Sequence, residues 1–193
     1  MGGQSRGTPT AKRAAIQASV LEATVALLDE GASYADLNIE RIATRAGISR
    51  TAFYFYFRDK RELLMRLTAE VSEQLYGVAD GWFSRTDDDL AAALGRVGEV
   101  YREHAPLVRA IVEVSTYDEE VATFWRGLVG RFVDATRARL EADGTTLPAQ
   151  ATAFALVWMT ERAFHQLGVQ DEPVPRAELV AALAGIWQRT AAG

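Results

Sequence analysis

Residues 38–64 have the sequence NIERIATRAGISRTAFYFYFRDKRELL, which contains two short segments with helical features. Asn38 is a favourable N-cap for a first helix, and Ser49 is one for a second helix over residues 50–57. Gly47 lies between them and suits the left-handed conformation that ends a helix. Two short helices joined by a glycine-containing turn are the pattern of a helix-turn-helix.

The same segment is rich in positive charge. Between residues 38 and 61, two acidic side chains accompany six basic ones, which are Arg41, Arg45, Arg50, Arg58, Lys60 and Arg61. Such cations bind nucleic-acid phosphates, and the start of the second helix is where base-reading side chains lie in this motif. These residues alone leave open the alternative that the segment does not bind DNA, because FYFYF at residues 53–57 is equally typical of a buried strand.

The rest of the chain also predicts helices. Apolar residues recur at helical spacing in seven further segments, which begin near Ala11, Asp59, Leu90, Pro106, Asp118, Pro148 and Arg176. Asp59 has Glu62 three residues on, a start similar to a capping box. The sequence therefore predicts an all-α fold of nine helices.

Composition narrows the function classes. Residues 1–68 carry ten Lys and Arg against seven Asp and Glu, whereas residues 69–193 carry eleven against nineteen. A basic head thus precedes an acidic body, within a total net charge of -5. The chain has no cysteine and two histidines, and no hydrolase, metalloprotease or nucleotide-binding motif is found. We therefore expect no metal, no cofactor and no enzyme activity.

No apolar run reaches the roughly 18 residues of a membrane span. The start, MGGQSRGTPTAKR, lacks the apolar region of a secretory signal. We therefore expect a cytoplasmic protein without membrane partners.

The helix-turn-helix segment resembles the N-terminal domain of TetR-family transcriptional regulators. The resemblance depends on Ile42, Ala43, Ala46, Gly47, Ile48, Ser49, residues 53–57, Lys60, Leu63 and Leu64. Further strings are similar to the ethionamide-resistance regulators, a subgroup of that family: Phe124-Trp125, Thr160-Glu161-Arg162 and Ile186-Trp187. Two departures from the subgroup are a shorter loop around Asp143-Gly144 and Thr160 in place of an amide side chain.

The resemblance implies a TetR-like fold, with a three-helix N-terminal helix-turn-helix domain and a six-helix C-terminal domain, and it implies a DNA site. The expected parts are a flexible arm over residues 1–10, a DNA-binding domain over residues 11–58, and a ligand-binding and dimerisation domain over residues 59–193. Arg50, Thr51 and Ala52 are expected to face bases, while Tyr54, Tyr56 and Lys60 are expected to bind phosphates. The full predicted set is Asn38, Arg45, Ser49, Arg50, Thr51, Ala52, Tyr54, Tyr56 and Lys60. The alternative for Tyr54 or Tyr56 is a place in the domain core, to which Phe53 and Phe57 are assigned.

The C-terminal part concentrates aromatic residues, as an apolar ligand pocket would. The residues expected to bind an apolar small-molecule effector are Tyr101, Trp125, Val129, Phe132, Thr136, Trp158, Thr160 and Glu161. The resemblance favours five of them, namely Tyr101, Trp125, Phe132, Thr160 and Glu161. The alternatives are that aromatic residues at helical spacing form ordinary core, and that Glu161 and Arg162 form a structural ion pair.

The resemblance also implies a homodimer through the last two helices, with exposed apolar faces at Ala155, Met159, Leu183 and Ile186. The expected function is a ligand-responsive repressor that binds a pseudo-palindromic double-stranded DNA operator. A regulator without small-molecule control and a helical interaction module are the alternatives.

Overall fold

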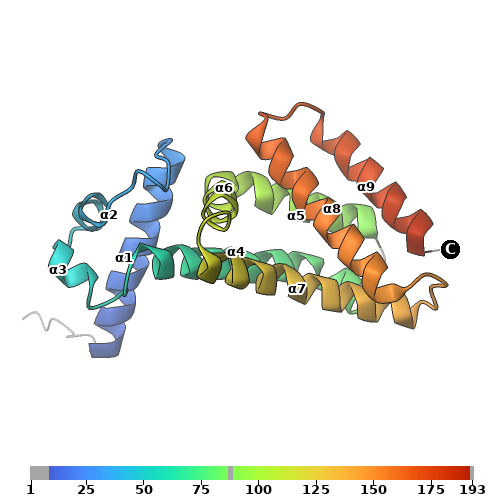
Figure 1. The fold of residues 1–193 in the computed structure, drawn as a ribbon, viewed down its shortest axis with the longest axis horizontal. Coiled ribbons are helices and arrows are strands. Elements are labelled where there is room, and N and C mark those ends of the chain that lie inside the picture. Colours follow the sequence, from blue (N-terminus) through green and yellow to red (C-terminus); the bar gives the residue numbers. More distant parts are fainter. Residues whose placement is uncertain (1–8, 87–88, 192–193) are drawn as a thin grey trace, which may run out of the picture. The chain divides into compact units, whose positions relative to one another are not determined.

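The computed structural model describes residues 9–86 and 89–191, and within these ranges the chain is entirely helical (Figure 1). The described helices are α1 (Pro9–Asp29), α2 (Ile39–Arg45), α3 (Arg50–Phe53), α4 (Lys60–Phe83), α5 (Leu90–Glu103), α6 (Ala105–Val114), α7 (Glu119–Ala142), α8 (Ala149–Val169) and α9 (Arg176–Ala191). The all-α prediction is confirmed. Residues 1–8 of the predicted arm lie outside the described residues, and α1 begins at Pro9, two residues before the predicted start.

The chain divides into two compact units, Met1–Leu67 and Thr68–Gly193, and the division falls within α4. In the N-terminal unit, α2 packs against both α1 and α3. The buried side chains of this unit include Val20, Leu27, Leu37, Ile42, Phe53, Phe57, Leu63 and Leu64.

The turn between α2 and α3 has the predicted geometry. The Asn38 side chain accepts a hydrogen bond from the Arg41 amide at 2.8 Å, so it caps α2. Gly47 has a φ of +71°, and the Ile48 amide donates to the Ala43 carbonyl at 3.0 Å. These bonds form a Schellman motif, which satisfies carbonyls that the end of α2 would otherwise leave unpaired.

Helix α3 is shorter than predicted. It starts with Ser49 as N-cap, whose hydroxyl accepts from the Ala52 amide at 3.1 Å, but it ends at Phe53 instead of Phe57. Residues 54–56 form a turn, because the Phe55 and Tyr56 amides bond to carbonyls three residues back. FYFYF therefore forms no strand. The buried rings of Phe53 and Phe57 stack with centroids 5.4 Å apart.

The start of α4 is fixed by two sets of contacts. Asp59 accepts from the Glu62 amide at 2.8 Å, and the Glu62 carboxylate accepts from the Arg58 amide at 2.7 Å. This is the reciprocal pattern of a capping box, displaced by one residue on the return bond. The Lys60 ammonium donates to the carbonyls of Tyr34, Ala35 and Leu37, at 2.7, 3.2 and 2.7 Å.

In the C-terminal unit, α8 packs along α7, and α9 packs against α5 and α8. Side chains of α7 hold α4: Arg139 donates to the Trp82 carbonyl at 2.6 Å, and Arg131 forms an ion pair with Glu73. Leu183, expected on an exposed face of α9, is buried inside this unit, so that expectation is wrong.

We expect Lys60→Met to destabilise the N-terminal unit by about 2 kcal/mol, because three carbonyls lose a charged donor. The measurement is the free energy of amide hydrogen exchange in α2 and α4. The matched control is Lys12→Met at the other lysine of the chain, which is exposed on α1. Equal protection in the two variants would contradict the structural role of Lys60.

Candidate functional site

The first candidate site is the exposed surface of α3 and the turn after it. Arg50, Thr51, Tyr54 and Phe55 line a shallow hollow on this surface. Phe55 is 71% exposed and Tyr54 is 48% exposed, although both are large aromatic residues. Exposed aromatic side chains beside an arginine form a surface suited to contacts with a nucleic acid.

Not every residue predicted for DNA binding is available on this surface. Arg45 pairs with Glu30 at 2.5 Å, and this hydrogen-bonded pair holds the pKa of the Glu30 carboxyl below its usual range. The Asn38 and Ser49 side chains serve as helix caps. Ala52 is half-buried, so it is only partly accessible on this surface.

Tyr56 and Lys60 lie against neighbouring elements. The Tyr56 ring is half-buried with the Arg13 guanidinium 5.6 Å from its centroid. The Lys60 ammonium lies 4.8 Å from the centroid of the Tyr34 ring. Burial lowers the pKa of Lys60, and Asp36 partly offsets that effect. The Lys60 ammonium has three N–H donors, and all three are used in bonds to carbonyls. A phosphate contact from Lys60 would therefore have to replace one of these bonds.

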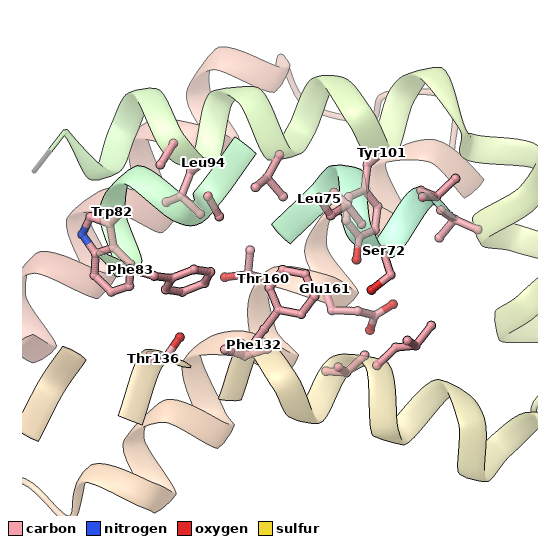
Figure 2. A pocket seen from close by; sticks show the side chains of 18 of the residues that line it. Ser72, Leu75, Trp82, Phe83, Leu94, Tyr101, Phe132, Thr136, Thr160 and Glu161 are labelled. Carbon is pink, nitrogen blue, oxygen red and sulfur yellow. The ribbon is translucent and has the colours of Figure 1, made fainter. Parts of the chain in front are cut away.

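The second candidate site is a cavity of about 100 Å³ inside the C-terminal unit (Figure 2). Its walls come from α4 to α9 and are almost wholly apolar. Seven of the eight predicted ligand-binding residues line it: Tyr101, Trp125, Val129, Phe132, Thr136, Thr160 and Glu161.

Trp158 is the eighth and does not belong to this lining. On α8 the buried residues Val157, Thr160, Glu161 and Phe164 face inward. A helix turns about 100° per residue, so Trp158 lies on the flank of that face. Its ring lies instead beside the exposed Phe154, with centroids 6.2 Å apart.

The polar atoms of the cavity differ in how their hydrogen bonds are satisfied. The Thr160 hydroxyl donates to the Leu156 carbonyl at 2.8 Å and accepts from the Trp187 indole at 3.0 Å, so it is committed within the protein. The hydroxyls of Ser72 and Thr136 are buried and have no hydrogen-bond partner. Neither oxygen of the buried Glu161 carboxylate has one either.

Glu161 dominates the electrostatics of the cavity. Burial raises the pKa of its carboxyl, and the nearby Arg162 guanidinium counteracts this. The Arg162 Nε atom lies 3.8 Å from Oε2, which is an ion pair without a hydrogen bond. Burial, together with the charge of Glu161, also raises the pKa of the Tyr101 phenol.

Several cavity residues were missed from the sequence. They include Ser72, Trp82 and Phe83 on α4, and Leu94 and Val97 on α5. No sequence signal singled out Ser72, because a serine within an apolar helix is equally typical of a position on the flank of its buried face. Phe55 was missed on the DNA side because it was counted only as part of an aromatic run.

Within residues 9–86 and 89–191, none of the helices combines the length and apolar character that crossing a membrane requires. Over the same ranges, no three His, Cys, Asp or Glu side chains gather as a metal site would need.

Family models match both parts of the chain. Residues 20–67 match bacterial regulatory proteins of the tetR family, and residues 90–193 match the C-terminal domain of the transcriptional regulator EthR. The HTH-type transcriptional regulator EthR of Mycolicibacterium smegmatis is 31% identical over 186 residues, which is 89% of this chain and 83% of that protein. EthR of Mycobacterium tuberculosis is 30% identical over 177 residues, covering 86% and 82%. The resemblance predicted from the sequence is confirmed.

Solved structures share the fold. A TetR-family regulator from Syntrophomonas wolfei has a TM-score of 0.73 at 15% identity, covering 96% of this chain and 97% of its own. FadR from Bacillus subtilis, solved in complex with stearoyl-CoA, has a TM-score of 0.74 at 14% identity, covering 88% and 96%.

We expect Glu161→Gln to raise the thermal unfolding midpoint at pH 7 to 8. Burial raises the pKa of Glu161 in the folded chain above its ordinary 4.5. The wild type therefore loses stability as pH rises from the unfolded pKa through the folded one, and the glutamine variant does not.

The advantage of the variant should vanish below about pH 3.5, where the carboxyl is protonated in both the folded and the unfolded wild type. Glu70→Gln, at an exposed position on α4, is the control and should leave the pH profile unchanged. A variant less stable than the wild type at pH 8 would refute this assignment of Glu161.

Proposed function

The chain belongs to the TetR family of DNA-binding transcriptional regulators, and we propose that it is a repressor controlled by an apolar small molecule. A dimer binds a pseudo-palindromic operator and releases it when the molecule occupies the cavity of the C-terminal unit. The observation that carries this proposal is the cavity itself, which is apolar, internal and lined by six helices.

Contacts with DNA are assigned to the exposed surface of α3. Arg50, Thr51 and Ala52 read bases in the major groove, with Arg50 suited to a bidentate contact with guanine. Tyr54 and Tyr56 contact the phosphate backbone. Phe55 joins this set, because a large exposed aromatic side chain offers an apolar contact to a thymine methyl group. Lys60 acts by holding α4 to the segment before α2.

A dimer through α8 and α9 is supported by apolar side chains left exposed on these helices. Phe154 is 56% exposed, and Ala155 and Ile186 are also exposed. Burying these side chains against a second copy would produce a four-helix interface with two-fold symmetry. Two recognition helices related in this way read half-sites about 34–36 Å apart.

Control by a ligand is assigned to the cavity and α4. FadR, a structural neighbour, is solved with stearoyl-CoA, which supports the capacity of this fold to hold an apolar chain. Helix α4 supplies cavity residues from Thr68 to Phe83 and also begins with Lys60 in the N-terminal unit. A ligand that displaces α4 therefore changes operator affinity, to the extent that it binds the released state better.

The proposal is tested by selecting duplexes from a random pool with the full chain at low and moderate salt. A pseudo-palindrome that survives moderate salt supports specific dimeric binding, whereas binding that falls evenly across sequences would contradict it. Release of the selected operator by a ten-carbon ketone, 2-decanone, would support ligand control. Operator binding without release favours a regulator that lacks small-molecule control.

We expect Arg50→Ala to weaken binding to the selected operator by about 1–3 kcal/mol and to relax preference at one base position per half-site. The measurement is a competition titration with single-base operator variants. Arg126→Ala removes the same charge from an exposed position on α7 and should leave base preference unchanged. Loss of affinity without any change in preference would contradict a base-reading role for Arg50.

We expect Val129→Phe to keep operator binding and to abolish its release by 2-decanone, because the larger ring fills the cavity that Val129 lines. The matched control is Val169→Phe at an exposed position at the end of α8, outside the cavity lining. Release that is unchanged in Val129→Phe would contradict the placement of the ligand.

A further inference from the structure

We propose that the cavity selects an elongated apolar amine, whose protonated head group binds between Glu161 and Ser72. This inference rests on the proposed function, since it names the class of molecule that the cavity holds. It begins from three buried oxygen atoms, namely Oε1 and Oε2 of Glu161 and Oγ of Ser72, none of which has a hydrogen-bond partner. Figure 2 shows both side chains pointing into the cavity.

Leaving three buried oxygen atoms without hydrogen-bond partners costs free energy. A buried carboxylate loses its hydration, and the ion pair of Glu161 with Arg162 at 3.8 Å returns no hydrogen bond to it. An ammonium group has three N–H donors and a positive charge, so it satisfies the oxygens and compensates the carboxylate at once. A ligand with only acceptor atoms can accept from the Ser72 hydroxyl but leaves both carboxylate oxygens of Glu161 without a donor.

The charge of the lining favours a cation. Among the cavity residues in the described part of the chain, Glu161 carries the single carboxyl group, and none has a basic side chain. Arg162 lies outside this lining, is about half exposed, and approaches no closer than 3.8 Å at its Nε atom. It therefore leaves the hydrogen-bonding capacity of Glu161 unused.

The shape of the cavity favours a long apolar body behind that head group. The lining residues of α4 extend from Thr68 to Phe83, which spans about 22 Å along a helix. Near the far end, Trp82, Phe83 and Phe132 provide aromatic walls. The Thr136 hydroxyl at this end is buried without a partner. It is uncharged, so this end suits the apolar part of a ligand and not its charged head group.

The test compares three ten-carbon probes with different head groups on the full chain at pH 7: decylamine, 2-decanone and decanoate. Binding is measured by quenching of tryptophan fluorescence, because Trp82, Trp125 and Trp187 line the cavity, and by the shift of the unfolding midpoint. We expect decylamine to bind at least about tenfold more tightly than 2-decanone. Its ammonium group donates charge-assisted hydrogen bonds to Glu161, whereas the ketone has no donor. Decanoate should bind most weakly.

Variants separate the head-group contact from the fold. In Glu161→Gln, the preference for decylamine over 2-decanone should fall by about tenfold, while 2-decanone itself binds as before. Thr136→Val, which removes the other unpartnered hydroxyl, should keep the preference. Arg162→Gln should keep or increase it, since the competing cation is lost. A preference that disappears in Arg162→Gln would overturn the direct contact with Glu161.

The remaining outcomes are distinct from a failure of the proposed function. If 2-decanone binds and releases the operator but decylamine binds no better, the amine proposal is overturned and ligand control stands. If Glu161→Gln retains the preference, Glu161 is not the head-group site. If all three probes fail to bind and to release the operator, the amine proposal and ligand control fall together.

Discussion

The ammonium group of Lys60 joins the start of α4 to the segment that precedes α2 in the N-terminal unit. A cation at a helix N-terminus faces the positive end of the helix dipole, so its place at the start of α4 needs compensation. Three carbonyls of the segment from Tyr34 to Leu37 supply it, and the Tyr34 hydroxyl donates in return to the Lys60 carbonyl. These bonds fix the start of α4 against the chain that leads into α2. In the sequence, α3 lies between this segment and α4, so the same bonds restrain both ends of the stretch that contains α3.

Short-range features of the sequence predicted much of this unit. The caps at Asn38 and Ser49 and the left-handed Gly47 involve residues within a few positions of each other, so local chemistry determines them. The length of α3 was not predictable in that way. Its end depends on burying Phe53 and Phe57 together while Phe55 stays exposed, which is a matter of tertiary packing. Lys60 was predicted to bind phosphate, and its bonds to carbonyls more than twenty positions earlier could not be predicted from local sequence.

The cavity shows the same division between local pattern and tertiary contact. Aromatic content, helical spacing and the family resemblance identified seven of its lining residues. Inward-facing residues are apolar whether or not a space lies between them, so the sequence pattern could not outline the cavity itself. The sequence could not separate Thr160 from Thr136. The first is committed to Leu156 and Trp187, whereas the second has an unpaired hydroxyl. It likewise placed Trp158 in the cavity with Glu161, although Trp158 lies on the flank of the inward face of α8 and outside the cavity lining.

Affinity and control are separable in such a cavity under the proposed mechanism. Glu161 belongs to α8, whereas the longest stretch of apolar wall belongs to α4. A head group that satisfies Glu161 contributes to affinity in any state in which that carboxylate remains buried, so it shifts no equilibrium by itself. The apolar body of the ligand contacts α4. The ligand can favour one of two positions of α4 only if its contacts with the helix differ between those positions. Selection of the ligand therefore depends on α8, and the response to it depends on α4.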